Sequence, residues 1–512
     1  MSKHDTDAKA LKVAKTLRNE HNWKHLARPS GFGFYNLQTE DTGDVPVRLF
    51  LTASLLDAAE DTLYRQIVNA TRFPGVKLVV ITPDTHYGYG VPVGCVLVTD
   101  ASTGAVAMGP VGYDIGCGMM SARSGVEAGA ATPEKKLEFN RAVMRRVDMG
   151  AGGKSVRLGN LSKTEFQSLV RGGAEYYVEK YGATFDRARA ERHRIPVDDD
   201  WQIPWGGKGR PERGLEQLGS LGGGNHFIEL QRAEETGTLF VQVHTGSRGF
   251  GHGLATNYFE LAREERPAEI KDIDLGYFTP ESRHYRDYLN AVAAGGNYAI
   301  LNRLVIFEQI ADAFREVFGA ELELVYEISH NLVQKEWHPE FGDVWVHRKG
   351  ATRAFPAGHP ALKGTVWEET GHPVLIPGSN KDWSYILRPR ERAANSAYSV
   401  NHGAGRKLSR GAATRTLSQR AIDDEYAAAG ILVNADGRVP LDEAAPAYKS
   451  SREVIEAVVG AGLAEVEYSL WPLASLKGVD ERKGRKGRRD KKGKEKRDKR
   501  GRGEGPKTSE HY

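Results

Sequence analysis

The chain has 512 residues, of which 40% are hydrophobic and 27% charged, a composition typical of a globular protein. No run of eighteen apolar residues is present and the N-terminus lacks the apolar core of a secretory signal, so neither a membrane span nor export is predicted. The net charge of +4 is uneven: residues 477–512 carry 16 Lys and Arg against 7 Asp and Glu, which leaves 55 against 60 for the rest.

Helical periodicity predicts the main helices. Amphipathic patterns cover residues 133–147, 163–181 and 451–459. The clearest pattern covers residues 285–318, where Gly295 and Gly296 predict an interruption and therefore a pair of helices. No tandem repeat is visible.

The composition of the chain predicts where its main body begins and ends. We expect an N-terminal segment over residues 1–47, a single large body over 48–478 and a basic, disordered tail over 479–512, because residues 483–507 contain no aromatic or aliphatic side chain. The tail could attract RNA by counterion release or act only as a solvated solubility segment. Residues 186–215 are polar and interrupted by Pro and Gly, which predicts a long surface insertion.

Six apolar, β-branched runs end in potential ligand residues beside small residues. They are LVVITPDTHYGYG, LFVQVHTGSRG, LVYEISHN, VWVHRKGA, PVLIPGS and YSVNHGAGR. Each is typical of a strand that ends in a tight loop, and glycine lets a bulky ligand approach the backbone. We therefore expect one pocket lined by strand ends.

The two cysteines indicate the compartment and a possible site. Cys95 and Cys117 cannot form a disulfide framework, so we expect a cytoplasmic protein with free thiols. Cys95, in GVPVGCVLVTD, is predicted to be a core residue. Cys117 follows Asp114 by three residues in the glycine-rich stretch GPVGYDIGCGMMSARSG.

Five residues are candidate metal ligands: Asp114, Cys117, His226, His244 and His330. Carboxylate, thiolate and imidazole together suit a transition ion such as Mn, Fe, Co or Zn, and a thiolate can bridge two ions. The alternatives stay open, because the spacing matches no established metal motif and a lone cysteine is most often a core residue.

Other polar residues near these segments have different expected roles. Asp84 and His86, in PDTHYGYG, could orient a metal ligand, because a metal-bound histidine commonly donates its second N–H to a carboxylate. Five further histidines in polar, loop-like settings are predicted to lie on the surface: His252, His284, His338, His359 and His372.

Three segments could contact a nucleotide. GSLGGGNHFIE (219–229) offers backbone N–H groups for phosphate but matches neither the Walker A nor the dinucleotide pattern. IPGSNKDWSYIL (376–387) and NHGAGRKLSR (401–410) offer small residues, hydroxyls and cations. His402 in the last segment could be a nucleophile that forms a phosphoramidate, a general base, a metal ligand or a structural histidine.

Taken in chain order, these motifs resemble the RtcB RNA ligase family. The resemblance rests on PDTHYGYGVPVG, GYDIGCGM, GSLGGGNHFIE, VHTGSRGFG, ISHN, HRKGATRA, IPGS and HGAGR, and it extends from about Arg48 to Gly478. It implies an α+β fold with a single large domain and a deep central cleft lined by strand ends and Gly-rich loops.

The resemblance implies an activity with its cofactors and partners. The expected enzyme joins RNA 3′-phosphate or 2′,3′-cyclic phosphate ends to 5′-hydroxyl ends, using GTP and two Mn(II) ions, in tRNA splicing or RNA repair. The implied partners are tRNA halves or broken RNA and an archease-type activator, with no membrane association and a monomeric state.

The resemblance also implies a role for each site residue. The five candidate ligands bind two ions with Cys117 as the bridge, and His402 carries the guanylyl group. Nucleotide contacts fall on Asn225, His226, Phe227, Ile228, Glu229, His330, Asn331, Pro377, Gly378, Ser379, Asn380, Ser384, His402, Gly403, Ala404, Gly405 and Lys477. After IPGS the sequence departs from the family pattern, because Asn380, Lys381 and Asp382 replace smaller residues.

Two other functions remain compatible with the sequence. The departure at residues 380–382 suits a metal-dependent RNA cyclic phosphodiesterase or hydrolase that lacks efficient ligation. The basic tail suits a non-catalytic RNA-binding protein.

Overall fold

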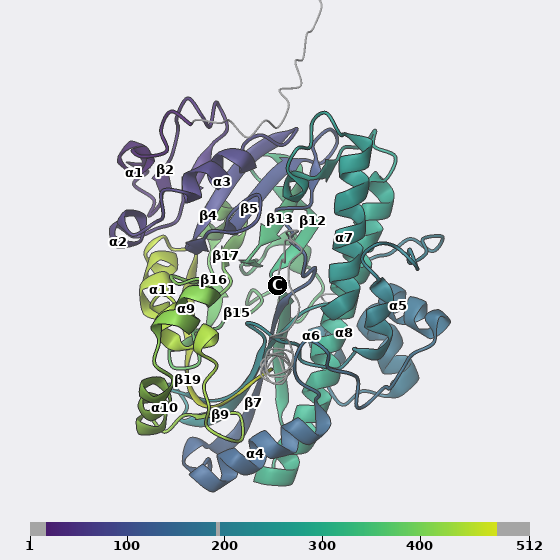
Figure 1. Ribbon diagram of the computed structural model, residues 1–512, viewed down its shortest axis with the longest axis vertical. Coiled ribbons are helices and arrows are strands. Elements are labelled where there is room, and N and C mark those ends of the chain that lie inside the picture. The colour runs from purple at the N-terminus through teal and green to yellow at the C-terminus, as the bar shows by residue number, and fades with distance from the viewer. Residues whose placement is uncertain (1–16, 191–194, 479–512) are drawn as a thin grey trace, which may run out of the picture.

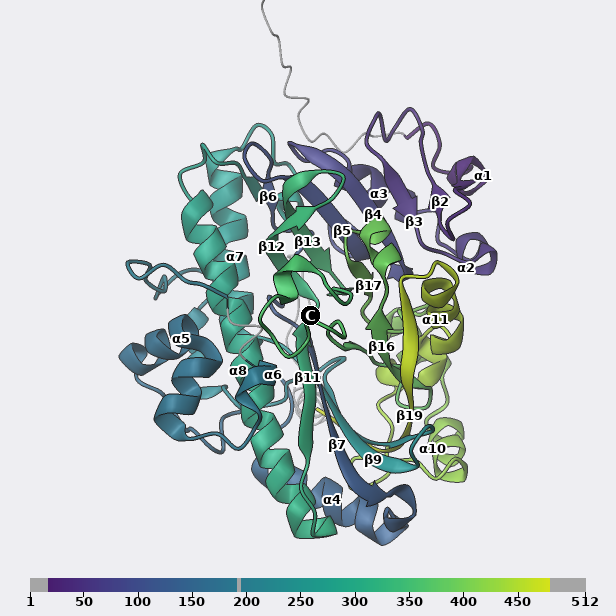
Figure 2. The same cartoon turned by 180° about the vertical axis from the view of Figure 1, so that it is seen from behind.

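The computed structural model describes residues 17–190 and 195–478, so the predicted basic tail lies outside the described residues. Two sheets occupy the centre, with the long helices α7 (Arg248–Glu265) and α8 (Tyr285–Phe318) on one side and α9 (Arg410–Thr416), α10 (Gln419–Ala428) and α11 (Ser451–Gly460) on the opposite side (Figures 1 and 2). This mixture of helices and mainly antiparallel sheets confirms the expected α+β class. Within the described residues, no helix has both the length and the apolar character needed to cross a bilayer.

The first sheet contains seven strands, and its pairings are antiparallel except between β3 and β4. Its spatial order is β1 (Arg28–Pro29), β2 (Tyr35–Asn36), β3 (Val47–Leu49), β4 (Val76–His86), β5 (Val93–Asp100), β13 (Gly342–Lys349) and β12 (Asn331–His338). The segment before residue 48 therefore contributes β1, β2 and the first residue of β3, and its Trp23 and Leu37 side chains are fully buried in the core.

The second sheet contains eight strands. Its path is β11 (Glu323–Ser329), β7 (Gly118–Glu127), β9 (Thr238–Thr245), β8 (Phe227–Ala233), β19 (Ala464–Lys477), β16 (Ser384–Pro389) and β15 (Val374–Ile376), and β18 (Leu432–Val433) pairs with β19. Two short ribbons pair β6 (Val106–Ala107) with β10 (Tyr277–Phe278) and β14 (Ala351–Arg353) with β17 (Ser399–Asn401). All six runs that were predicted to be strands are strands, which confirms that part of the sequence analysis.

Strand register in the second sheet sets the position of the candidate ligands. Gly118 of β7 pairs with Thr245 of β9 on one side and with Ser329 of β11 on the other. Phe227 of β8 pairs with His244 of β9. Each of these paired residues is, or directly adjoins, one of the ligands Cys117, His226, His244 and His330, so one edge of the sheet brings together segments that are far apart in sequence.

The remaining helices are α1 (Trp23–Leu26), α2 (Ala53–Asp57), α3 (Leu63–Ala70), α4 (Pro133–Arg146), α5 (Lys163–Tyr181) and α6 (Arg187–Ala190). The predicted helices over 133–147, 163–181 and 451–459 correspond to α4, α5 and α11. Ser162 caps α5 by accepting a hydrogen bond from the Glu165 N–H.

The predicted break at residues 295–296 is wrong, because α8 is one helix of 34 residues. A Cβ on Gly295 would lie 3.0 Å from Ile115, and one on Gly296 would lie 2.6 Å from Ile195 and 3.0 Å from Leu332. These glycines let neighbouring segments pack closely against α8, so the burial of apolar side chains compensates for the low helix propensity of glycine.

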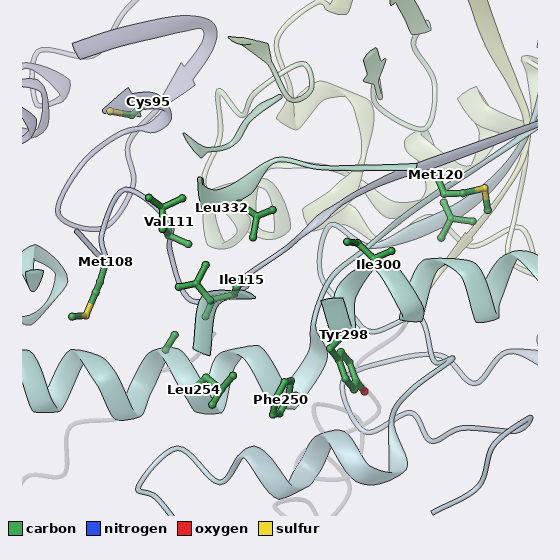
Figure 3. Close-up of a cluster of buried hydrophobic side chains, with 14 of the residues drawn as sticks. Cys95, Met108, Val111, Ile115, Met120, Phe250, Leu254, Tyr298, Ile300 and Leu332 are labelled. Atoms are coloured by element: carbon green, nitrogen blue, oxygen red, sulfur yellow. The ribbon is translucent and has the colours of Figure 1, made fainter. Parts of the chain in front are cut away.

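The largest hydrophobic cluster lies between the sheets and the α7–α8 pair. Figure 3 shows Ile115 and Leu332 together in this cluster, near Leu254 of α7. Cys95 is fully buried in the same cluster, which confirms its prediction as a core residue. The segment over residues 186–215 also contributes to this cluster, because Trp201 and Ile203 are buried there.

Three of the histidines that were predicted to lie on the surface are buried, and that prediction is wrong for them. The exposed fractions are 3% for His338, 7% for His359 and 0% for His372. His359 stacks on Phe355 with ring centroids 3.9 Å apart, and the Nε2 of His372 accepts a hydrogen bond from the Phe355 N–H. The residues next to these histidines in sequence are polar, whereas their aromatic and backbone partners come from segments that only the fold brings close.

Candidate metal and nucleotide site

A cavity of about 360 Å³ lies where the strand ends of both sheets meet. His86 at the end of β4, His244 in β9 and Pro377 directly after β15 line it, as do His330 after β11 and His402 after β17. The cavity therefore contains residues from separate strand ends, in agreement with the pattern in the sequence.

The five candidate metal ligands converge at one end of this cavity. The Cys117 Sγ lies 3.3 Å from the Nε2 of His244 and 3.7 Å from the Nε2 of His226. The Nε2 of His330 lies 3.3 Å from the Nε2 of His244, and the Asp114 Oδ2 lies 3.1 Å from the Nε2 of His226. The donor atoms form two groups that share the thiol: Cys117 with His244 and His330, and Asp114 with Cys117 and His226.

Hydrogen bonds at Nδ1 orient the rings of His226 and His244 so that Nε2 could bind a cation. The Nδ1 of His226 lies 3.1 Å from the Leu221 carbonyl, and the Nδ1 of His244 lies 3.0 Å from the Asn225 carbonyl. A carbonyl only accepts, so each Nδ1 is the donor of this contact, and each Nε2 faces other candidate ligand atoms: Cys117 for His244, and Asp114 and Cys117 for His226. Lone pairs that face one another fit a bound cation, and the donor set of thiolate, imidazole and carboxylate fits a transition metal.

The surroundings favour two neutral imidazoles and a protonated thiol beside the charged Asp114 before a cation binds. Burial lowers the pKa of His244 and of His330 well below the ordinary histidine value, so both rings are neutral. Burial, reinforced by the charge of Asp114, raises the pKa of the Cys117 thiol well above its ordinary value. A cation would stabilise the thiolate, so metal binding at this site would release a proton.

Glycine at one position makes room for the acidic ligand. A Cβ on Gly246 would lie 2.3 Å from the Asp114 Oδ1, which excludes any larger residue there. The N–H of Ser247 donates to the same oxygen at 3.0 Å. The chain after β9 therefore fixes the carboxylate beside the thiol.

His402 lies next to the metal-ligand cluster and is held by Asp84. The Nδ1 of His402 lies 2.5 Å from the Asp84 Oδ2, and the same oxygen accepts hydrogen bonds from the N–H groups of His402 and Gly403. Burial raises the pKa of Asp84, but His402 and the hydroxyl of Thr82 outweigh it, and the net pKa is lowered. The ring of His402 makes an edge contact with that of His330, with centroids 5.0 Å apart. A carboxylate only accepts, so the ionised Asp84 favours the tautomer of His402 that carries its proton on Nδ1.

This arrangement differs from the expected role of Asp84 and His86. The Asp84 carboxylate orients His402 and takes its other side-chain hydrogen bond from Thr82, rather than from one of the five ligands. His86 lines the cavity, its Nδ1 faces the Asp84 carbonyl at 3.1 Å, and burial lowers its pKa to about 4.

Most residues expected to contact the nucleotide line the same cavity. They are Asn225, Phe227, Glu229, His330, Asn331, Pro377, Gly378, Ser379, Asn380, His402, Gly403, Ala404, Gly405 and Lys477. His226, Ile228 and Ser384 are not among the lining residues. Ser384 lies behind the wall, where its Oγ accepts hydrogen bonds from the Gly378 N–H and from the Gln231 side chain.

Residues 380–382, which depart from the family pattern, contact the C-terminal helices α10 and α11 through polar side chains. The Oδ1 of Asn380 accepts a 2.5 Å hydrogen bond from the Tyr426 hydroxyl of α10. Lys381 forms an ion pair with Glu425 of the same helix, and Asp382 accepts a hydrogen bond from the Ser451 N–H at the start of α11. Of the three replaced residues, only Asn380 lines the cavity.

Sequence analysis missed a buried carboxylate that organises the cationic wall of the cavity. Glu443 is 2% exposed and lies 3.3–3.4 Å from the side-chain nitrogens of Lys477, Arg406 and Arg410. It also accepts a 2.5 Å hydrogen bond from the Tyr448 hydroxyl. Nothing in the loop sequence LDEAAPAYKS distinguishes this glutamate from a solvated one, whereas the two arginines lie in NHGAGRKLSR, which was expected to contact anions.

Lys349 is a second missed residue, although it lies in the motif HRKGATRA. It lines the cavity and is 6% exposed, and its Nζ donates to the carbonyls of Tyr89 and Val91 at 2.6 and 3.2 Å. Burial lowers its pKa to about 8, so the amine changes charge close to neutral pH.

Comparison with known proteins identifies the family. The sequence model for tRNA-splicing ligase RtcB matches residues 66–478. A tRNA-splicing ligase RtcB of Pyrobaculum aerophilum is 36% identical over 466 residues, covering 85% of this chain and 95% of the relative. An RNA-splicing ligase RtcB of Mycobacterium tuberculosis is 37% identical over 439 residues, covering 81% of this chain and all of the relative. Each motif of the resemblance also supplies at least one residue to the lining of the strand-end cavity. On these matches, this chain belongs to the RtcB family.

Proposed function

We propose that this protein is a GTP-dependent RNA ligase that joins RNA 3′-phosphate or 2′,3′-cyclic phosphate ends to 5′-hydroxyl ends. The observation that carries the proposal is His402, which Asp84 holds in one tautomer and one orientation at the edge of a cluster of five metal ligands. The names of the relatives, which are tRNA-splicing and RNA-splicing ligases, support RNA as the substrate.

The cluster fits two Mn(II) ions. His244 and His330 would hold one ion, Asp114 and His226 the other, and Cys117 both. When bound, such ions neutralise phosphate charge and act as Lewis acids. The protein contributes a buried and largely preformed set of donor atoms.

His402 is the proposed nucleophile. Its Nε2 attacks the α-phosphorus of GTP, a P–N bond forms, and the P–O bond to pyrophosphate breaks. Asp84 stabilises the positive charge that develops on the ring during attack and prevents the ring from turning.

Two further transfers complete the reaction. An oxygen of the RNA 3′-phosphate attacks the phosphorus on His402, which breaks the P–N bond and leaves GMP on the RNA end. The 5′-hydroxyl of the second RNA then attacks the RNA 3′-phosphorus and GMP leaves. A cyclic end first requires hydrolysis to a 3′-phosphate, because only a free phosphate oxygen can accept the guanylyl group.

The walls of the cavity differ in charge, and we assign them to different parts of the nucleotide and RNA. Glu229 lies 2% exposed on one wall and is a candidate hydrogen-bonding partner for the guanine base, together with Asn380 and the Ser379 segment. Arg406, Arg410 and Lys477 form a cationic wall suited to the phosphates of GTP or RNA. We propose that the protein acts as a monomer in the cytoplasm with an archease-type activator.

Mass spectrometry after incubation with GTP and Mn(II) tests the proposal. One added GMP is expected on His402 in the wild type and in a His284→Ala control, and none in His402→Ala. An unmodified wild-type protein that hydrolyses 2′,3′-cyclic phosphate ends would instead support the phosphodiesterase alternative. RNA binding without either reaction would support a non-catalytic role.

A further inference from the structure

Arg303 lies in the middle of α8, is fully buried and contacts the segments that carry three metal ligands. Its Nη1 donates to the carbonyls of Gly116 and Thr245 at 2.8 and 2.9 Å, and its Nη2 donates to the Ser329 hydroxyl at 2.8 Å. Its Nε donates to Glu327 of β11 at 2.5 Å.

These contacts correspond to one of the two donor groups. Gly116 directly precedes Cys117, Thr245 directly follows His244, and Ser329 directly precedes His330. One guanidinium therefore connects the three segments whose side chains form the Cys117–His244–His330 group. Its planar fork matches several acceptors at once, which a lysine ammonium on a flexible stem does not.

The neighbouring residue, Asn302, contacts the segments around the other donor group. Its Oδ1 accepts from the Gly219 N–H at 2.7 Å, and its Nδ2 donates to the Ser220 and Gly246 carbonyls at 3.2 and 3.1 Å. The same Nδ2 also lies 3.2 Å from the Thr245 hydroxyl, beside His244, so Asn302 contacts segments of both groups but mainly those of this one. Residues 219 and 220 begin the glycine-rich loop that leads to His226.

Gly246 links Asn302 to the acidic ligand. It packs directly against the Asp114 carboxylate, because a Cβ on this glycine would overlap both carboxylate oxygens. Asn302 therefore acts on the Asp114–Cys117–His226 group through the loop of His226 and through the backbone beside Asp114.

General stability alone does not explain this arrangement. Taking an arginine and a glutamate out of water is costly, and an apolar pair of similar volume often stabilises a fold equally well. A second buried pair in this chain joins Arg348 to Glu336, and its arginine donates to Ser399 and to the carbonyls of residues 397 and 398. These acceptors lie outside the segments that carry the metal ligands, so the pair provides a control of the same chemistry.

We propose that Arg303 and Asn302 are positioning residues of the metal centre, with Arg303 holding the Cys117–His244–His330 group and Asn302 holding the Asp114–Cys117–His226 group. The proposal rests on the two-ion site proposed above. Residues that orient metal ligands without touching the metal commonly change metal affinity by about 10–100-fold when they are replaced.

The test measures Mn(II) binding to the full chain by isothermal titration and by electron paramagnetic resonance of free Mn(II), below the unfolding temperature of each variant. Arg303→Lys is expected to weaken one ion by about 10–100-fold. In anomalous maps at limiting Mn(II), that ion is the one at His244 and His330. Asn302→Ala is expected to weaken the ion at Asp114 and His226 more than the ion at His244 and His330, and Arg348→Lys to leave both affinities unchanged.

Each result is informative. Wild-type Mn(II) affinities in a folded Arg303→Lys protein would overturn the positioning role and leave the ligase proposal intact. Mn(II) binding that is weakened equally in Arg348→Lys and in Arg303→Lys would have the same consequence. A wild-type protein that binds no Mn(II) would overturn the two-ion site itself. If Arg303→Lys does not fold, Ser329→Ala removes one acceptor of the guanidinium, and unchanged binding of the His330 ion in that variant would also refute the inference.

Discussion

The Asp84 Oδ2 lies 2.5 Å from the Nδ1 of His402 and also accepts the backbone N–H groups of His402 and Gly403. One carboxylate oxygen therefore sets the tautomer of the ring and the conformation of the loop that carries it. This oxygen is the basis of the first prediction.

Asp84→Asn is expected to slow guanylylation of His402 by up to about 10⁴-fold, the effect of replacing the carboxylate that orients a reacting histidine by an amide. Mn(II) affinity should change little, because the hydrogen bonds of the Asp84 carboxylate go to His402, Gly403 and Thr82 rather than to the five ligands. Single-turnover formation of the GMP adduct, with the exposed Asp44→Asn as control, measures the effect. Loss of Mn(II) binding in Asp84→Asn would contradict the separation of the two sites.

Glu229 predicts a pH dependence of stability. Burial raises its pKa to about 7, above the unfolded value of about 4.3, so between these pH values the folded state binds more protons than the unfolded state. Stability contributed by protonated Glu229 is therefore fully present below about pH 4.3 and is lost as the pH rises through about 7. Denaturant unfolding at several pH values measures this effect. The unfolding free energy of Glu229→Gln should decrease less over this pH range than that of the wild type, by an amount on the order of 3 kcal/mol. Glu234→Gln, an exposed change just after β8, should behave as the wild type.

Glu443→Gln is expected to disturb the cationic wall. Removing the charge leaves Lys477, Arg406 and Arg410 without their common buried partner, and breaking a buried ion network costs about 3 kcal/mol of unfolding free energy. Chemical denaturation measures this loss. Asp442→Asn is the control, because Asp442 contacts Arg406 through its backbone carbonyl, which the substitution keeps. Equal stability of the two variants would show that Glu443 does not organise the wall.

Gly118→Ala tests the strand register that assembles the metal ligands. A Cβ there would lie 2.2 Å from the Ile328 carbonyl oxygen, so β7 and β11 must separate. A loss of roughly 1–3 kcal/mol is expected, together with weaker Mn(II) binding, because Cys117 and His330 flank this pairing. Gly125→Ala is the control in the same strand, because a Cβ at that position would have no described atom within 4 Å, and it should leave Mn(II) binding unchanged.

Much of the fold and the candidate site could be predicted from the sequence, because the signals are local. A β-branched run followed by His, Asp or Ser and a glycine identifies a strand end, and the amphipathic patterns of α4, α5 and α11 need no tertiary information. The five candidate ligands and His402 all lie in such strand-end or glycine-rich segments.

The sequence-based predictions were wrong or incomplete where packing between segments far apart in sequence determines the structure. Gly295 and Gly296 weaken a helix in isolation, but Ile115, Ile195 and Leu332 use the space that they leave. Glu443 and Arg303 are ordinary charged residues in the sequence, and only the folded chain surrounds them with partners. The ion pairs of Glu443 and the hydrogen bonds of Arg303 join residues more than twenty positions apart, which no local pattern records.

The register around Gly118 also determines when during synthesis one of the two donor groups can form. Cys117 meets His330 only after β11 has joined β7, so a growing chain that has not yet released residue 330 lacks one complete donor group. The Asp114–Cys117–His226 group needs no residue beyond 226, so the two donor groups become complete at different stages of synthesis, and the shared Cys117 is in place before the last histidine.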